Sequence, residues 1–243
     1  MPLSLARSGG RADLVIDRAP VNVLDGESLE ELGRLVRGVD EQVLVLSGLR
    51  RAFSAGVSVA EHAPEPAAIE TMLAAMRHAL GALVDTPAVT IASISGACLG
   101  GGAEIAAACD LVLVSHDARI GFPEIGLACF PPGAAALLAL RIGEARANEW
   151  ILTGRVLSGR EAARAGFAAR SVAPSELESE TTRLAERLST TGAAALAAAR
   201  DLLREERRRA LAEVLPRAEA AYRRLAGDAD LARAVEGFGK RKG

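Results

Sequence analysis

The sequence predicts an α/β fold in which strands and helices alternate up to about residue 140, followed by a wholly helical region. The first observation behind this prediction is a series of apolar runs of strand length, separated by stretches with helical spacing. The second is composition: hydrophobic residues make up 50% of the chain but aromatic residues only 3%, which favours closely packed layers of small side chains. Repeated strand, crossover and strand units predict parallel strands with right-handed crossovers.

The first predicted elements lie between residues 3 and 58. Residues 3–17 form a hairpin with a Gly-Gly turn, and residues 25–39 form an amphipathic helix. Residues 43–47 are continuously apolar, as expected of a strand whose two sheet faces are both covered. A loop over residues 48–58 follows this strand.

The next crossovers repeat the pattern. Helical spacing over residues 67–83 ends before Pro87, and residues 89–94 give another apolar strand. Three glycines at 100–102 open the next helix, and residues 111–114 form the strand after it.

The last part of the chain is predicted to consist of helices joined by short returns. These helices span residues 146–152, 158–165, 175–189, 192–203 and 205–225. In the last of them, glutamates such as Glu219 interleave the arginines at helical spacing, which favours a solvated or subunit-contact helix over an RNA-binding surface.

Charge and cysteine content narrow the classes of partner. Lys plus Arg number 29 and Asp plus Glu 31, a formal net charge of −2, so no global field attracts nucleic acid or an anionic membrane. No apolar run approaches a transmembrane span or a signal-peptide core, so we expect a cytoplasmic protein. Cys98, Cys109 and Cys129 lack metal or disulfide spacing and lie in apolar stretches, which predicts buried free thiols and no metal site.

The glycine cluster in CLGGGAEIAAACD is open to two interpretations. It lacks the spacing and the Lys-Ser/Thr ending of a phosphate-binding loop. Without a Cβ, the N–H of Gly101 at a helix start can point at a substrate oxygen, as in an oxyanion hole. Alternatively, the glycines only allow the helix to pack closely on the sheet.

Two acids near this cluster differ in their surroundings. Glu104 lies in the first turn of the predicted helix, where the helix dipole favours a carboxylate even in a purely structural role. Glu124 lies in IGFPEIGLACFPPG, among apolar residues, and burial there would raise its pKa. Such unlike carboxyls are typical of a base and acid pair.

Four ordered segments together resemble one known family. AFSAGVSV, ISGACLGGGAEIAAACDLVLVS, ARIGFPEIGL and LTGRVLSGREAARAGF are similar to the successive signatures of the enoyl-CoA hydratase/isomerase (crotonase) superfamily, at the family's spacing. The resemblance implies an α/β fold made of a crotonase-type spiral of ββα turns over residues 1–190. It also implies a helical trimerisation region over residues 191–243, and a homotrimer or a dimer of trimers.

The resemblance further implies a site. The backbone N–H groups of Val57 and Gly101 would hold a thioester oxygen, with Glu104 as base and Glu124 as acid in the hydration of an enoyl-CoA. Coenzyme A would arrive as part of the substrate, with no separate cofactor. Residues that match the family's coenzyme A contacts are Val21, Ala55, Val57, Ser58, Val59, Phe238 and Lys240, the last two of which could equally lie in a frayed tail.

Departures from the family pattern bear on the substrate. Ser58 replaces a usual Asp, Phe122 replaces a polar residue, and Pro132 lacks the N–H that relatives offer near the catalytic water. The segments AFSAGVSVAEHAPE, PVNVLD and FPPGAAALLALRIG resemble the branch that hydrates cyclohexa-1,5-dienecarbonyl-CoA. In that reading Phe122, Phe130, Pro132 and His62 line the substrate pocket, whereas isolated phenylalanines are more often ordinary core residues.

Two other activities fit the same scaffold. An isomerase needs only one glutamate as proton shuttle, and a non-enzymatic RNA- or protein-binding homologue would need neither. The presence of both Glu104 and Glu124 favours hydration.

Overall fold

A computed structural model describes residues 3–49, 52–58 and 65–240, with the side chains of 238–240 outside that description. The larger sheet has six strands in the spatial order β1 (Leu3–Ser8), β2 (Arg11–Ile16), β4 (Val43–Gly48), β7 (Val89–Ile94), β9 (Leu111–Ser115) and β12 (Arg170–Val172). Only the β1–β2 hairpin is antiparallel among these neighbours. The predicted hairpin and the three long apolar strands are confirmed.

Short strands build the other sheets. A four-stranded sheet has the order β11 (Val156–Ser158), β10 (Arg119–Gly121), β8 (Ala97–Leu99) and β5 (Ala52–Ser54). The two-residue strands β3 (Val23–Leu24) and β6 (Gly56–Val57) pair in parallel. Three-residue strands such as β5, β8 and β10 carry too little pattern to be predicted from sequence.

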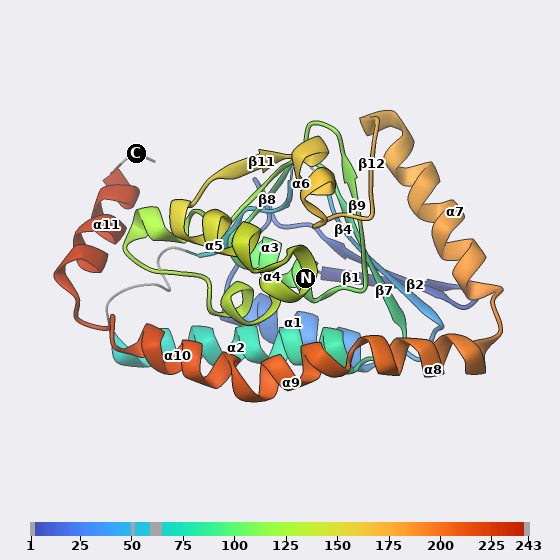
Figure 1. The fold of residues 1–243 in the computed structure, drawn as a ribbon, viewed down its shortest axis with the longest axis horizontal. Coiled ribbons are helices and arrows are strands. Elements are labelled where there is room, and N and C mark those ends of the chain that lie inside the picture. The colour runs from blue at the N-terminus through green and yellow to red at the C-terminus, as the bar shows by residue number, and fades with distance from the viewer. Residues whose placement is uncertain (1–2, 50–51, 59–64, 241–243) are drawn as a thin grey trace.

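The chain winds as a repeated ββα turn. Each turn adds a strand to the large sheet, a strand to the four-stranded sheet and a helix, as in β4, β5 and α2 (Pro66–Asp85) or β7, β8 and α3 (Gly101–Ala108). The spiral expected from the family resemblance is therefore confirmed (Figure 1).

The remaining helices surround these sheets. They are α1 (Gly26–Arg37), α4 (Pro132–Ile142), α5 (Glu144–Thr153), α6 (Gly159–Ala165), α7 (Leu177–Ser189), α8 (Ala193–Leu203), α9 (Glu205–Glu213), α10 (Leu215–Arg223) and α11 (Ala229–Lys240). Short 3-10 turns, η2 (Pro123–Leu127) and η3 (Pro174–Glu176), connect others. The single helix predicted over residues 205–225 is in fact two, because Pro216 at the start of α10 has no N–H to continue the helical bonding.

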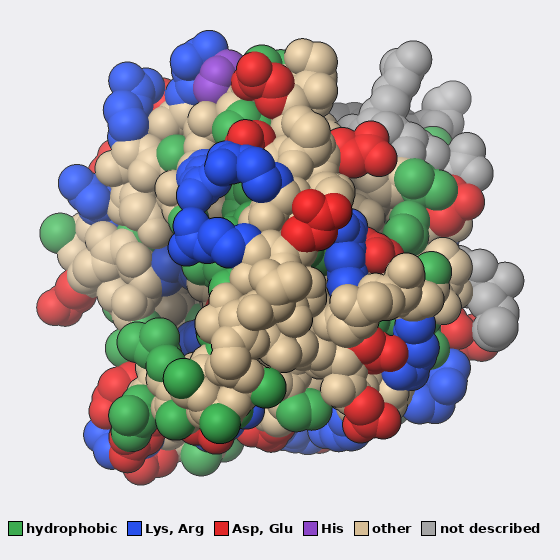
Figure 2. Space-filling model, turned by 90° about the vertical axis from the view of Figure 1, so that its right-hand side faces the viewer, with side chains coloured by type: hydrophobic (Ala, Val, Ile, Leu, Met, Phe, Trp, Pro, Cys, Tyr) green, Lys and Arg blue, Asp and Glu red, His purple; other side chains and the backbone are tan. Residues whose placement is uncertain are grey.

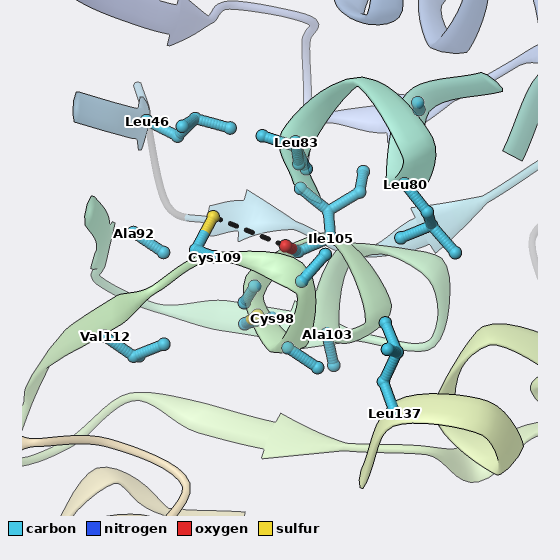
Figure 3. Packing of buried hydrophobic residues seen from close by; sticks show 14 of the residues in the cluster. Leu46, Leu80, Leu83, Ala92, Cys98, Ala103, Ile105, Cys109, Val112 and Leu137 are labelled. Carbon is cyan, nitrogen blue, oxygen red and sulfur yellow. Dashed lines mark hydrogen bonds between the residues drawn. The ribbon is translucent and has the colours of Figure 1, made fainter. Parts of the chain in front are cut away.

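The core is centred on α3. All eight residues of this helix are buried, and its alanines allow close packing between the sheets and α2. Figure 3 shows Ala103, Ile105 and Cys109 pointing into a cluster with Leu80 and Leu137. All three cysteines are buried and free, as the sequence predicted.

Helix α2 corrects one expectation. By length and composition this 20-residue helix could cross a membrane, although its sequence was not expected to provide such a segment. Its apolar face, from Ile69 to Val84, is buried in the protein core, and a core helix of this length passes the same test.

Helices α9 and α10 lie against the core of the same chain. They run along the lower edge of Figure 1 and both pack against α2 and α4, whereas α8 extends beyond them on the right. Arg204, between α8 and α9, is fully buried, as is Glu219 in α10, so neither is the solvated residue that the sequence pattern suggested.

Candidate active site

A cavity of about 720 Å³ opens between the loop that follows β4 and ends at Ser58 (the first loop), the glycines at 100–102 (the glycine turn), η2 and the C-terminal helix α10. Its walls are mainly apolar, and they include Met72 and Met76 from α2 and Leu127 from η2. Glu104 and Glu124 both reach this cavity. An apolar cavity with a few convergent polar groups is the usual form of a small-molecule site.

The first loop is held in place by buried hydrogen bonds. Asn22, fully buried with φ 55°, donates its side-chain amide to Ala52 O (2.7 Å) and Leu49 O (2.9 Å). Ser54 Oγ donates to Asn22 O (2.7 Å) and accepts the N–H of Gly56 (3.1 Å). These bonds fix the backbone immediately before Val57.

The backbone at Val57 lies against the glycine turn. A Cβ on Gly101 would lie 3.5 Å from Val57 N, and one on Gly56 would lie 3.6 Å from Gly101 N. Ser58 N donates to Leu24 O in the neighbouring strand, so alternation along β6 turns the N–H of Val57 to the other side. The two amides predicted to form an oxyanion hole are thus close neighbours on the cavity wall.

The glycine turn also leaves donors free of the helix. Gly100, with φ 51°, precedes α3, and its carbonyl accepts the N–H groups of Ala103 (2.8 Å) and Glu104 (3.0 Å). The N–H of Gly101 precedes these first internal bonds, so the helix itself supplies no partner for it. The helix dipole adds positive potential at this position.

Glu104 lies at the N-termini of two helices. It is in the first turn of α3, only 3% exposed, and its Oε1 accepts the N–H of Ala134 (2.9 Å) at the start of α4. Burial raises the pKa of Glu104 to about 7, although hydrogen bonds from the Ala134 and Gly133 backbones act in the opposite direction. Pro132 has no N–H itself, and the two donors after it serve this carboxyl.

Glu124 has a different environment. It is 8% exposed in η2, and its Oε2 is buried without a hydrogen-bond partner among the residues that the structure describes. Burial, and then the charge of Glu104, raises the pKa of Glu124 to about 8. A Cβ on Gly100 would lie 2.7 Å from Glu124 Oε1, so only glycine fits beside this carboxyl.

The two carboxyls can therefore divide acid and base work. Glu104 receives donors from α4 that favour its ionised form, whereas Glu124 is desolvated, lies near the charge of Glu104 and has an Oε2 without a partner among the described residues, all of which favour its protonated form. A water held between them could lose a proton to one while the other supplies a proton to carbon.

The other predicted site residues, apart from Phe122, divide into three groups. Val21, Ala55, Ser58, Phe130 and Pro132 line the cavity. Val59 and His62 lie outside the described residues. Phe238 and Lys240 belong to α11, and their side chains are not described.

Phe122 is a correction. We expected it in the substrate pocket, but it is fully buried and packs edge-on against Trp150, with 5.6 Å between ring centroids. It directly precedes η2, and the described cavity wall does not include it. The ordinary core interpretation of an isolated phenylalanine is the correct one here.

Residues of α10 were missed. Leu215, Glu219 and Tyr222 line the cavity, and Glu219 forms an ion pair with Arg77 of α2 (2.5 Å). Their spacing of three to four residues marks one helix face. This spacing could be read from the sequence, but nothing in the sequence indicated that the helix lies beside the glutamates.

Comparison with known proteins identifies the family. A family model described as enoyl-CoA hydratase/isomerase matches residues 8–242. The chain belongs to the enoyl-CoA hydratase/isomerase family. It is accordingly an enzyme of the hydro-lyase type that acts in acyl-CoA metabolism.

Relatives and solved structures agree with this assignment. The chain is 34% identical over 167 residues to a cyclohexa-1,5-dienecarbonyl-CoA hydratase from Thauera aromatica, across 67% of this chain and 64% of that protein. It is 31% identical over 218 residues to a probable enoyl-CoA hydratase from Rhizobium meliloti, across 87% and 84%. The fold matches an enoyl-CoA hydratase crystal structure from Mycobacterium avium subsp. paratuberculosis with a TM-score of 0.89 at 23% identity, covering 99% and 96% of the two chains.

Proposed function

We propose that this enoyl-CoA hydratase/isomerase family member adds water across the α,β double bond of an acyl-CoA thioester, with Glu104 as base and Glu124 as acid. The observation that carries the proposal is the pair of buried, unlike carboxyls in one cavity beside the amides of Val57 and Gly101.

The proposed reaction balances over these groups. Glu104 takes a proton from water as its oxygen bonds to the β-carbon, and the π electrons move onto the thioester oxygen. The amides of Val57 and Gly101 stabilise that oxygen, each by about 3–4 kcal/mol if they resemble donors in known oxyanion holes. Glu124 then delivers its proton to the α-carbon, and the carbonyl re-forms. Transfer of the proton on Glu104 to Glu124, through the next water, restores both groups for another turnover. No cofactor is required, because coenzyme A is part of the substrate.

Coenzyme A would pass along the first loop. Val21, Ala55 and Ser58 line the cavity beside the amide of Val57, where backbone atoms can follow a pantetheine chain. Val59, Phe238 and Lys240 remain predicted contacts.

A ring-shaped acyl group is the substrate we favour. The relative from Thauera aromatica is a cyclohexa-1,5-dienecarbonyl-CoA hydratase, and Phe130, Pro131 and Pro132 give this cavity a rigid apolar wall. Hydration rates measured side by side on crotonyl-CoA and cyclohexa-1,5-dienecarbonyl-CoA test this choice. We expect the cyclic thioester to be preferred, and a strong preference for crotonyl-CoA would refute it.

Glutamine substitutions test the proposed roles. We expect Glu104→Gln and Glu124→Gln each to lower kcat by about 100-fold or more, since general acid or base catalysis contributes that much. Near-normal turnover in both variants would end the proposal.

Two alternatives are separated by direct assays. Isomerisation would move the double bond without incorporating heavy oxygen from labelled water, whereas hydration incorporates it. RNA binding would show salt-sensitive retention without turnover. On the face shown in Figure 2, acidic and basic side chains are interspersed, which favours the enzyme over an RNA-binding protein.

A further inference from the structure

Among the described residues, the carboxyl of Glu124 has no hydrogen-bonding anchor outside its own turn. Glu104 Oε1 accepts the N–H of Ala134 (2.9 Å), whereas the Glu124 carboxyl is bonded by its own backbone and its Oε2 has no partner in the described part of the chain. The position of Glu124 therefore depends on the backbone of its turn. That turn, η2, ends at Ala128 with φ 56°, a left-handed conformation that costs a non-glycine residue free energy and needs support from its surroundings.

Cys129 supplies part of this support. Its backbone N–H (3.2 Å) and its Sγ (3.5 Å) both donate to the carbonyl oxygen of Glu124. The side chain is buried, and burial raises the pKa of the Cys129 thiol to about 11, so the S–H proton stays available for donation.

Tyr222 continues the chain of contacts from α10. Its side chain lies in the same buried cluster as Cys129 and interacts with the thiol, and its ring packs against Phe130 with 5.6 Å between centroids. Burial raises the pKa of Tyr222, so its hydroxyl also remains a donor. One turn earlier on α10, Glu219 is paired with Arg77 of α2, which fixes the helix against the cavity wall.

We propose that Tyr222 and Cys129 are positioning residues for Glu124, because Tyr222 of α10 packs with Cys129, whose N–H and Sγ both donate to the backbone of the catalytic turn. The inference rests on the proposed function of Glu124 as acid. It gives the C-terminal helical region a part in catalysis within its own chain. Tyr222 acts through Cys129, so the two residues should behave as one unit.

Three variants test the link on the full-length protein. Tyr222→Phe removes the hydroxyl but keeps the ring, Cys129→Ala removes the thiol, and Cys129→Ser restores a donor. We expect Tyr222→Phe and Cys129→Ala each to lower kcat by about three- to tenfold, as loss of one hydrogen bond implies, with KM changed less than about twofold. Cys129→Ser should recover activity relative to Cys129→Ala.

The pH profile and the double variant distinguish positioning from simple packing. A looser turn admits water, weakens the effect of burial on Glu124 and lowers its pKa, so the alkaline limb of kcat/KM should move to lower pH in both single variants. Adding Tyr222→Phe to Cys129→Ala should cause little further loss, because the two act in series. Cys109→Ala, which removes a comparable buried Sγ bond to Ile105 O (3.4 Å), is the matched control and should keep the wild-type profile.

The outcomes separate this inference from the proposed function. A wild-type protein that hydrates neither crotonyl-CoA nor the cyclic thioester would contradict the function itself. An active wild type with unchanged kcat and alkaline limb in Tyr222→Phe and Cys129→Ala would overturn this inference alone. Additive losses in the double variant, or equal losses in Cys129→Ser and Cys129→Ala, would also overturn it.

Discussion

Glu104 and Glu124 differ because of what surrounds each carboxyl, not because of their residue type. Glu104 receives N–H donors at the start of α4, which oppose the effect of burial on its pKa. Glu124 has no such donor for Oε2, and the nearby charge of Glu104 further favours its protonated form. One proton shared between two such groups suits an acid and base pair that must act together.

This difference sets the expected pH dependence. A base works only when deprotonated, so kcat/KM should rise with pH as Glu104 ionises, near its raised pKa of about 7. An acid works only when protonated, so the rate should fall as Glu124 ionises near about 8. A stopped-assay profile from pH 5 to 10 measures both limbs, which belong to the coupled pair. A flat profile down to the ordinary glutamate pKa of 4.5 would contradict the assignment.

Gly100 is predicted to tolerate no side chain. Its φ of 51° is unfavourable for alanine, and a Cβ would lie 2.7 Å from Glu124 Oε1. We expect Gly100→Ala to lower kcat/KM by about tenfold or more, because strain and displacement of Glu124 act together. Gly126→Ala in η2 is the matched control, since a Cβ there meets nothing within 4 Å. Equal activity of the two variants would refute this account.

Among individual residues, the sequence predicted the two glutamates and the two backbone amides of the site, but not the side chains that pack around them. Glu104, Glu124 and the glycines lie in compact motifs that can be recognised in one chain. Phe122 and Phe130 both occur near Glu124, and only packing places one in the core and the other on the cavity wall. Tyr222 is 98 positions after Glu124 along the chain (222 minus 124), and no local pattern signals that the two segments meet.

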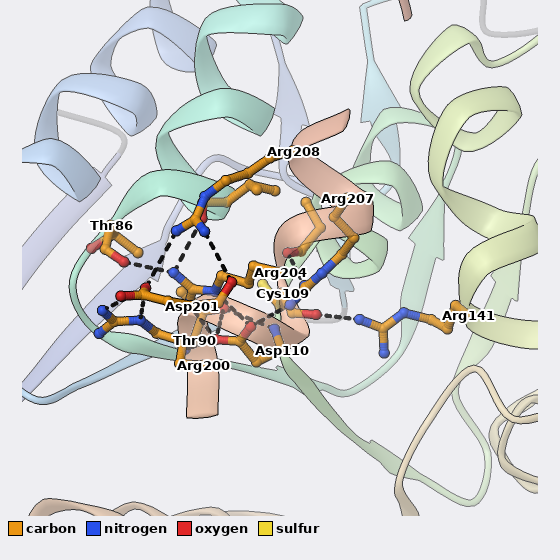
Figure 4. Close-up of polar contacts among 12 residues, drawn as sticks. Thr86, Thr90, Cys109, Asp110, Arg141, Arg200, Asp201, Arg204, Arg207 and Arg208 are labelled. Atoms are coloured by element: carbon orange, nitrogen blue, oxygen red, sulfur yellow. Dashed lines mark hydrogen bonds and ion pairs between the residues drawn. The ribbon is translucent and has the colours of Figure 1, made fainter. Parts of the chain in front are cut away.

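Among the elements, the junction of α8 and α9 is tied most firmly to the core. Arg204 is fully buried and donates to the carbonyls of Val84 (3.2 Å), Thr86 (2.6 Å) and Ala88 (2.7 Å), and it pairs with Asp110 (Figure 4). Burial alone would raise the pKa of Asp110, but the hydrogen bonds and charges of Arg204 and Arg207 lower it to about 2. This network holds the start of the C-terminal region against β7 and β9.

Breaking the network should be costly. Arg204→Met leaves Asp110 ion-paired with Arg207 alone among the described residues and removes the Arg204 donor from three buried carbonyls. We expect the free energy of unfolding, measured in urea, to fall by about 3–5 kcal/mol. Arg209→Met, at an exposed position beside Glu206, should change it by less than about 0.5 kcal/mol. A loss in Arg204→Met no larger than in this control would show that the network contributes little.

Helices and strands could be predicted where their pattern of apolar residues was long. The strands β4, β7 and β9 and the helix α2 each carry enough apolar residues to be recognised. The strands β5, β8 and β10 have three residues each and were missed, as was α4, whose start among prolines and glycine resembles a loop.

In the whole molecule, α8 is the C-terminal helix that packs least on the described part of its own chain. None of its residues is buried, and Leu202 and Leu203 are 74% and 78% exposed. A helix with no buried face gains little stability from its own chain. The homotrimer that the family resemblance implies would give this helix a surface to cover, and the division of the chain at residue 190 stays a prediction.

Light scattering can test this expectation. We expect a mass of three chains, or a multiple of three, for the wild type, and dissociation when Leu202 and Leu203 are both replaced by glutamate, because charge opposes burial at an interface. Leu152→Glu, at a position 69% exposed on α5, tests whether any surface leucine has the same effect. A wild type with the mass of one chain would contradict the prediction.

The dry environment of Glu124 also has a consequence for directed evolution. A buried acid with an oxygen that no group satisfies makes the folded state less stable than it would be with an apolar residue of similar size, such as methionine. A screen of random variants for heat resistance alone should therefore enrich replacements at position 124, and the survivors would be robust but inactive. Any such campaign needs an activity step in every round to keep this residue.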